Sequence, residues 1–131
     1  MVFRAFAVIL FFVFSTPAIY AQVSKTIHQT FTLDNADKIT LNLDSKVINY
    51  KETKGTRILV ETKITLSLPN QSLLDFVVNN GRYKLTKTVD ATSRELSLSS
   101  QKNKNVIVVK GQECREDVVH TIYVPSSVKR F

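Results

Sequence analysis

Hydrophobic and polar positions alternate most regularly over residues 57–68. Every second position from 58 onward carries an apolar side chain or a threonine, and most positions between carry a charged or hydroxyl group. Because successive side chains of a strand point to opposite faces, this pattern predicts a half-buried β-strand of about twelve residues. One face of that strand needs a core to cover it, and the other face meets solvent.

Shorter segments with the same alternation lie on both sides of this strand. We predict strands over residues 26–33, 38–43, 46–51, 82–89, 95–99, 105–110 and 117–124, and turns over 34–37, 44–45, 54–56, 90–93 and 111–116. Successive strands joined by turns of a few residues predict an antiparallel meander, with 57–68 as its central strand. We expect Pro125 to end the last strand and no closing element to follow it.

The spacing of apolar positions along the chain changes after Pro69, where the sequence predicts one short helix. Residues 73–80 place apolar side chains at helical spacing, Ser72 can cap the start, and Gly81 can end the helix in the left-handed conformation. The alternative is another strand, because the bulky residues 76–78 are poor helix formers.

We expect Ile64 and Leu66 of the long strand to face this helix through Leu73 and Val77. The predicted fold is therefore mainly β. It is an antiparallel meander that is sandwich-like or starts a β-solenoid, with one short helix near residues 73–80.

The first 21 residues have the composition of an export signal. A basic start ending at Arg4 precedes ten consecutive apolar residues, and residues 15–17 break the run. Cleavage after Ala21 is favoured over cleavage after Ala18. An uncleaved membrane anchor is the alternative, but the segment falls short of the roughly 20 apolar residues that a spanning helix needs.

We therefore predict a signal peptide over residues 1–21 and no membrane span after its removal. Residues 22–131 then form a single β-rich domain, either complete or cut short at its C-terminal end. The expected location is the periplasm or the cell surface.

Composition narrows the choice of partners. Removing residues 1–21 takes away one of 18 basic residues, so 17 basic and 11 acidic residues give a net charge of +6. Lysines and arginines are spread from Lys25 to Arg130 without a block, which argues against a nucleic-acid partner. Anionic components of a cell envelope, or another protein, fit this moderate excess.

Cys114 is the only cysteine, so no internal disulfide can form and an apolar core must hold the domain together. Its thiol is either buried and inert, which we favour, or exposed and able to pair with another chain.

The sequence predicts no catalytic, cofactor-binding or metal-binding residue, and hence no enzyme. His28, His120 and Cys114 do not suffice for a tetrahedral metal site. His120 and Cys114 could form a thiol–imidazole pair for nucleophilic catalysis. We favour a structural, partly buried histidine instead, because an extended strand over 117–124 puts His120 on an apolar face.

Two further motifs have both a functional and a structural interpretation. Glu113, Arg115, Glu116 and Asp117 form a mixed-charge cluster that could contact a cation or a ligand, although a solvated loop is the favoured interpretation. Residues 70–72, Asn-Gln-Ser, match the acceptor pattern for N-glycosylation, which matters only in a eukaryotic protein.

The most particular motifs are Gly-Arg-Tyr-Lys-Leu at residues 81–85 and Tyr-Val-Pro at residues 123–125. Through these motifs and the order of its β segments, the chain over about residues 30–129 resembles the N-terminal portion of exported bacterial proteins in the putative-adhesin, head-domain family of unknown function. The resemblance implies a β-rich fold that continues in family members as short strands stacked in a solenoid or sandwich. This sequence departs from the pattern by stopping at Phe131. No catalytic residue comes with the resemblance.

Two hypotheses of function follow. The first is an exported, non-enzymatic β-domain with a structural, cell-surface or adhesin-like role, whose outward strand faces are the contact surface. The alternative is a periplasmic binding or sensing module for a polysaccharide or peptide. A closed pocket of several hundred cubic ångströms lined by Tyr and Arg would favour the alternative. An exposed sheet edge near Arg130 would favour the first.

Overall fold

The computed structural model describes residues 22–45, 47–102 and 104–130, so the predicted signal peptide lies outside this part of the chain. The described residues form strands and one helix, as predicted. In chain order these are β1 (Ser24–Thr32), β2 (Lys38–Asn42), β3 (Val47–Thr53), β4 (Arg57–Leu66), α1 (Gln71–Asn79), β5 (Thr86–Asp90), β6 (Glu95–Ser99), β7 (Ile107–Val109), β8 (Gln112–Cys114), β9 (Glu116–Pro125) and β10 (Lys129–Arg130).

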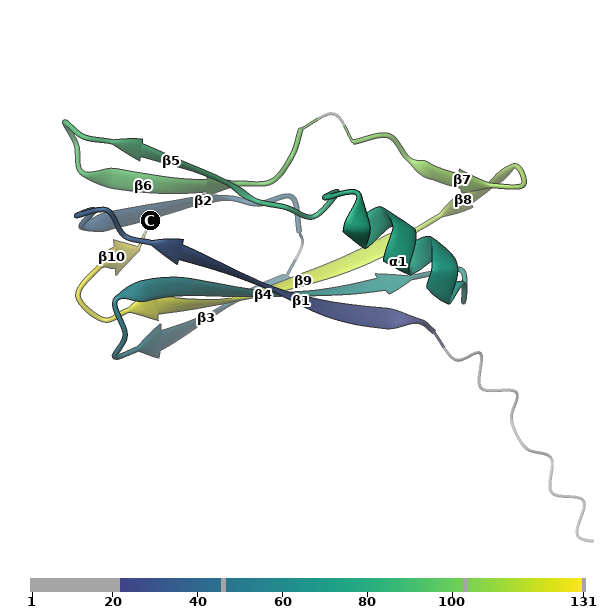
Figure 1. The fold of residues 1–131 in the computed structure, drawn as a ribbon, viewed down its shortest axis with the longest axis horizontal. Coiled ribbons are helices and arrows are strands. Elements are labelled where there is room, and N and C mark those ends of the chain that lie inside the picture. The colour runs from purple at the N-terminus through teal and green to yellow at the C-terminus, as the bar shows by residue number, and fades with distance from the viewer. Residues whose placement is uncertain (1–21, 46, 103, 131) are drawn as a thin grey trace, which may run out of the picture.

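Two four-stranded sheets face each other. Sheet A has the strand order β1-β4-β9-β3, and sheet B has the order β10-β2-β6-β5. Sheet B and α1 both lie on one side of sheet A, above it in Figure 1. β7 and β8 form a separate two-stranded ribbon beyond the helix.

The predicted antiparallel meander is wrong in its connections. β3 runs parallel to β9, and β2 runs parallel to both β6 and β10. The reason is that β1, β2 and β3 go to alternate sheets, while β9 inserts between β3 and β4. Alternation marks a half-buried strand but does not identify its neighbour, because both sheets bury one face in the same way.

The long strand is an inner member of sheet A, as predicted, although it ends at Leu66 instead of at position 68. Its predicted apolar face is the buried one, since Ile58, Val60, Thr62, Ile64 and Leu66 have no exposed surface. The strand therefore has one face in the core and one face that remains accessible.

The helix begins earlier than predicted. Asn70 is the N-cap, and its side-chain oxygen accepts a hydrogen bond from the backbone N–H of Leu73 at 3.0 Å, so Ser72 lies inside the helix. The turn after the helix contains Gly81 at φ +77°, as predicted. Phe76 lies on the outward side of the helix, with 62% of its surface exposed. No helix among the described residues is long and apolar enough to cross a membrane.

Three short segments differ from the prediction. Residues 82–85 form a turn and an irregular segment, so β5 begins only at Thr86. The expected turn over 111–116 instead contains β8 and the first residue of β9. β10 follows Pro125, the last residue of β9, and adds to the edge of sheet B beside β2.

The core has two parts. One cluster fills the space between the sheets and contains Ala36, Ile39, Ile58, Val60, Leu85, Leu96, Leu98, Ile122 and Val124. The other lies under the helix and contains Ile64, Leu66, Leu74, Val77, Tyr83, Ile107 and Cys114. Ile64 and Leu66 thus pack in the same cluster as the helix, as predicted, with Leu74 more deeply buried than Leu73. Between the clusters, the buried Thr62 hydroxyl has no hydrogen-bond partner among the described residues.

A pair of substitutions on neighbouring β4 positions tests which face is buried. Ile64→Asp should lower the free energy of unfolding by more than about 3 kcal/mol, because it places a carboxylate in the apolar cluster. Lys63→Asp should change it by less than about 1 kcal/mol, because that side chain meets solvent. Urea unfolding followed by circular dichroism measures both, and equal tolerance of the two variants would contradict the assigned faces.

Candidate functional site

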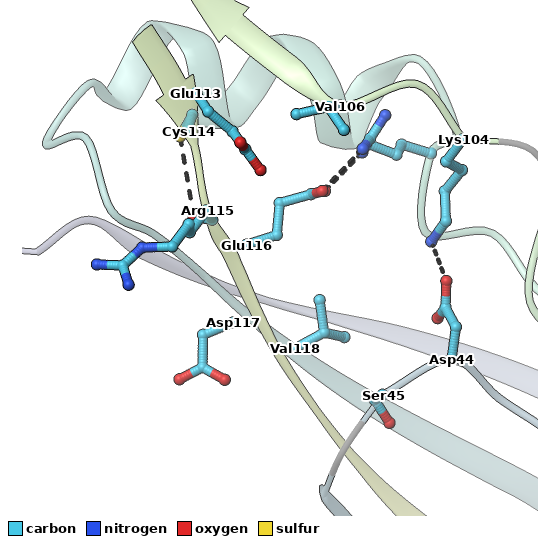
Figure 2. A pocket seen from close by; sticks show the side chains of 11 residues that line it. Asp44, Ser45, Lys104, Val106, Glu113, Cys114, Arg115, Glu116, Asp117 and Val118 are labelled. Atoms are coloured by element: carbon cyan, nitrogen blue, oxygen red, sulfur yellow. Dashed lines mark hydrogen bonds and ion pairs between the residues drawn. The ribbon is translucent and has the colours of Figure 1, made fainter.

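An open groove of about 490 Å³ runs alongside the start of β9. Its walls come from the loop after β2, the turn after α1, the segment before β7, and the β8–β9 junction. Figure 2 shows the lining side chains, which are Asp44, Ser45, Arg82, Lys104, Val106, Glu113, Cys114, Arg115, Glu116, Asp117 and Val118. The groove therefore joins four segments that are far apart in the sequence.

A partly buried ion pair forms one wall of the groove. The Arg82 guanidinium donates from Nε to Glu116 Oε1 at 2.5 Å and from Nη2 to Glu116 Oε2 at 2.7 Å. Arg82 Nη2 also donates to the carbonyl oxygen of Asn105, and the Tyr83 hydroxyl donates to Glu116 Oε1 at 2.6 Å. A two-point Arg–carboxylate pair with a third donor is a strong and directional arrangement.

The same contacts set the protonation of the groups involved. Burial acts to raise the pKa of Glu116, but the hydrogen bonds from Arg82 and Tyr83 outweigh it, and the pKa lies below its ordinary value. Burial and the adjacent carboxylate raise the pKa of Tyr83. The carboxylate is thus held ionised and accepts three hydrogen bonds, two from Arg82 and one from Tyr83.

A second ion pair ties two loops together above this wall. Lys104 Nζ lies 2.8 Å from Asp44 Oδ2 and 5.6 Å from the centre of the Tyr83 ring. Figure 2 shows Lys104 and Asp44 reaching toward each other across the groove. The pair links the loop after β2 to the segment between β6 and β7.

His120 and Cys114, considered above as a thiol–imidazole pair, have different hydrogen-bond partners. His120 is buried, and its Nδ1 lies 2.7 Å from the hydroxyl of Ser45. Cys114 is a buried free thiol whose Sγ lies 3.8 Å from Ser67 Oγ. Among the described residues the two side chains bond different serines and not each other, and the favoured prediction that both are buried is confirmed.

The described residues contain no group of three or more His, Cys, Asp or Glu side chains that could hold a metal ion.

The mixed-charge cluster is divided by the start of β9. Glu116 was expected in a solvated loop, but it is the first residue of the strand and faces Arg82. Arg115 and Asp117 leave the strand on the opposite side in Figure 2, and both are exposed, as is Glu113. Sequence analysis missed the Arg82–Glu116 pair, because the two residues are 34 positions apart and nothing in their local patterns links them.

The accessible face of sheet A is the second candidate surface. We call this surface the outer face; none of the other labelled elements lies below it in Figure 1. The register of the strands arranges its central side chains in three rows: Thr30, Leu59, Tyr123 and Lys51; His28, Glu61, Thr121 and Asn49; and Thr26, Lys63, Val119 and Val47. Hydroxyl, amide and charged groups therefore surround a few apolar side chains.

A chain of contacts crosses the outer face from β1 to β3. His28 Nε2 lies 3.4 Å from Glu61 Oε1, and the Tyr123 hydroxyl donates to Glu61 Oε2 at 3.5 Å. Lys51 Nζ lies 5.5 Å from the centre of the Tyr123 ring. The single carboxylate in these rows is therefore already engaged, while the ring of Tyr123 is held across the sheet between Glu61 and Lys51.

A double-mutant cycle tests the ion pair in the groove wall. Glu116→Gln and Arg82→Gln should each lower the free energy of unfolding by about 2–3 kcal/mol, because each leaves the partner's charge partly buried without a counter-ion. The double variant should lose less than the sum, with a coupling of about 1–3 kcal/mol. Chemical unfolding of the four proteins measures the coupling, and purely additive losses would contradict the pair.

Acidification tests the buried histidine. Burial lowers the pKa of His120 below its ordinary value of 6.5, the nearby Asp44 charge partly opposes this, and Lys104 adds to it. The unfolded chain therefore binds this proton more readily, so stability should fall as the pH drops below about 6.5. Asp44 and Glu116 have lowered pKa values, so the loss of stability from these two groups begins only near pH 5.

His120→Gln should flatten the stability profile between about pH 6.5 and pH 5. The matched control is Asn49→Gln, an exposed position on the outer face that changes no titratable group and should leave the slope in this interval unchanged. Thermal unfolding over a pH series measures the slope, and a slope that persists in His120→Gln would assign it to another group.

No protein-family model and no curated protein matches the sequence. The structure is similar to a putative adhesin from Bacteroides fragilis, with 19% sequence identity, a TM-score of 0.43, and coverage of 80% of this chain and 37% of that chain. It is also similar to a putative cell adhesion protein from Clostridium sporogenes, with 15% identity, a TM-score of 0.39, and coverage of 77% and 42%.

This chain thus spans less than half the length of either solved structure. Both names agree with the resemblance found in the sequence. At these identities and TM-scores neither protein assigns a function to this chain.

Proposed function

We propose that this chain is a domain of an exported protein that acts by contact and not by catalysis, in a structural, cell-surface or adhesin-like role. The observation that carries the proposal is the outer face of sheet A. Four strands present alternate side chains there, and no described element covers them.

The chemistry of this face suits contact with another surface. Leu59 and Tyr123 lie opposite each other across β4 and β9 and give a small apolar centre. Threonine, asparagine and lysine side chains surround that centre and can donate or accept hydrogen bonds without a further change of structure. An apolar centre within a polar rim is the common arrangement of protein contact sites.

An open edge supports the structural part of the proposal. β10 is the last strand in the order of sheet B and pairs only with β2 among the described strands. Its other edge presents backbone groups that an additional strand could pair with. A longer β-structure could therefore extend sheet B at this edge.

A second candidate function is a binding module for a peptide or polysaccharide, and the groove beside β9 favours it. Its volume of about 490 Å³ lies in the range of ligand sites. Arg82 and Glu116 neutralise each other, so the groups left to contact a ligand are Glu113, Arg115 and Asp117.

An adhesion assay separates the two candidates. Beads coated with residues 22–131 should be retained on cells of the producing organism or of its neighbours. Lys63→Glu on the outer face should lower retention at least about fivefold, which corresponds to about 1 kcal/mol for one reversed charge. Lys84→Glu, an exposed lysine away from that face, is the control for net charge.

Retention that is lost with Arg115→Glu but kept with Lys63→Glu would favour the groove instead. Retention that is absent in the unaltered protein would contradict the adhesive role. Fractionation of the producing cells tests export separately, and recovery of the full precursor in the cytoplasm would contradict it.

A further inference from the structure

Three cations on the outer face have no carboxylate partner among the described residues. Lys51 lies on β3, and Arg57 and Lys63 lie on β4. The salt bridges of the described residues involve Lys25, His28, Arg82, Lys87, Arg94 and Lys104 and none of these three. The one carboxylate between them, Glu61, is engaged by His28 and Tyr123. Asp117 on β9 lies on the same face beyond Lys63, so the three cations face two carboxylates and the face keeps a small positive excess.

The register sets the spacing of these cations. Lys51 lies in the row of Leu59 and two strands from β4, whereas Arg57 and Lys63 lie two and four positions from Leu59 along β4. With strands about 4.8 Å apart and about 3.4 Å per residue, their Cα atoms are separated by roughly 12 to 20 Å. A small anion cannot span this distance, but an extended polymer with repeated negative charges can.

Tyr123 lies within the area bounded by the cations. Its hydroxyl reaches Glu61 and its ring lies beside Leu59, so the side chain is directed across the sheet. Lys51 reaches over the ring on a flexible stem and can move aside for a ligand. Hydroxyl and amide groups of Thr30, Thr121 and Asn49 occupy neighbouring positions in the rows.

We propose that the outer face binds an acidic polysaccharide whose sugar rings carry carboxylates. Lys51, Arg57 and Lys63 contact carboxylates of separate sugars along the polymer, and the Tyr123 ring packs against the apolar face of one sugar between them. The threonine and asparagine side chains exchange hydrogen bonds with its hydroxyl groups. This inference rests on the proposed contact function and adds the chemical class of the partner.

The observations favour a sugar polymer over an acidic polypeptide. Charge alone would bind both, but the neutral positions around Tyr123 are mainly hydroxyl and amide groups, with few apolar side chains to hold a peptide. A sugar offers both a hydroxyl-rich edge and an apolar face, so it can use the polar rows and the aromatic ring together. Loss of the ring should therefore weaken binding of a sugar polymer more than binding of an acidic polypeptide.

Calorimetric titration of residues 22–131 with alginate oligosaccharides tests this inference, with dextran and polyglutamate as the neutral and acidic controls. We expect binding to alginate that is at least tenfold tighter than binding to polyglutamate, and no binding to dextran. Lys51→Gln and Lys63→Gln should each weaken alginate binding about two- to fivefold. Lys84→Gln, which removes the same charge elsewhere, should leave it unchanged.

The ring is tested with Tyr123→Thr, which keeps a strand-forming residue and should weaken alginate binding about tenfold. Tyr123→Phe keeps the ring and should retain most of the affinity. It therefore serves as the comparison if Tyr123→Thr lowers the melting temperature as well as the affinity. Circular dichroism of each variant verifies the fold.

Equal affinity for alginate and polyglutamate, or equal effects of Lys84→Gln and Lys63→Gln, would overturn the inference in favour of charge alone. Absence of alginate binding would also overturn it. If coated beads then still adhere to cells and lose adhesion with Lys63→Glu, the contact function stands with a different partner. If adhesion is absent as well, both proposals fail.

Discussion

The antiparallel register between β4 and β9 is the constraint on which the rest of the structure depends. It places Thr62 opposite His120 and Ile64 opposite Val118 on the inner face, and it puts the residues between them on the outer face. Because side chains alternate strictly, a slip of one residue would carry the apolar set to solvent and the charged set into the core. One register therefore fixes both the buried clusters and the surface that we assign to contact.

A second constraint ties the helix to this pair of strands. Glu116 begins β9 opposite Leu66, and its carboxylate holds Arg82 and Tyr83 from the turn after α1. The backbone N–H of Leu85 then donates to the side-chain oxygen of Gln29 on β1, at 2.9 Å. Residues 81–85 thus combine a left-handed glycine, an ion pair and two buried side chains within five positions. This gives a physical reason why the motif stands out in the sequence.

The sequence predicts the existence of most elements because each depends on a local pattern. The period of two over 57–68 identifies the strand, and the change of period after Pro69 identifies the helix. Strand partners were predicted wrongly, since pairing β3 with β9 joins segments about seventy residues apart. The short strands β8 and β10 were missed because their few residues carry no alternation long enough to recognise. The same limit applies to the groove, whose walls come together only through the tertiary fold.

The outer face and the groove differ in what a ligand must displace. In the groove, Arg82 is already bound to Glu116 and Lys104 to Asp44, so a charged ligand gains an interaction with these four side chains only by breaking one that exists. On the outer face, Lys51 and Lys63 have no such partner among the described residues, so a ligand displaces their hydration and the contact of Lys51 with the Tyr123 ring. Each exposed ion pair contributes little by itself, typically below about 1 kcal/mol. Useful affinity on such a face must come from several contacts made at once, and a polymer with a repeating charge can supply them along one chain and across neighbouring copies of the domain.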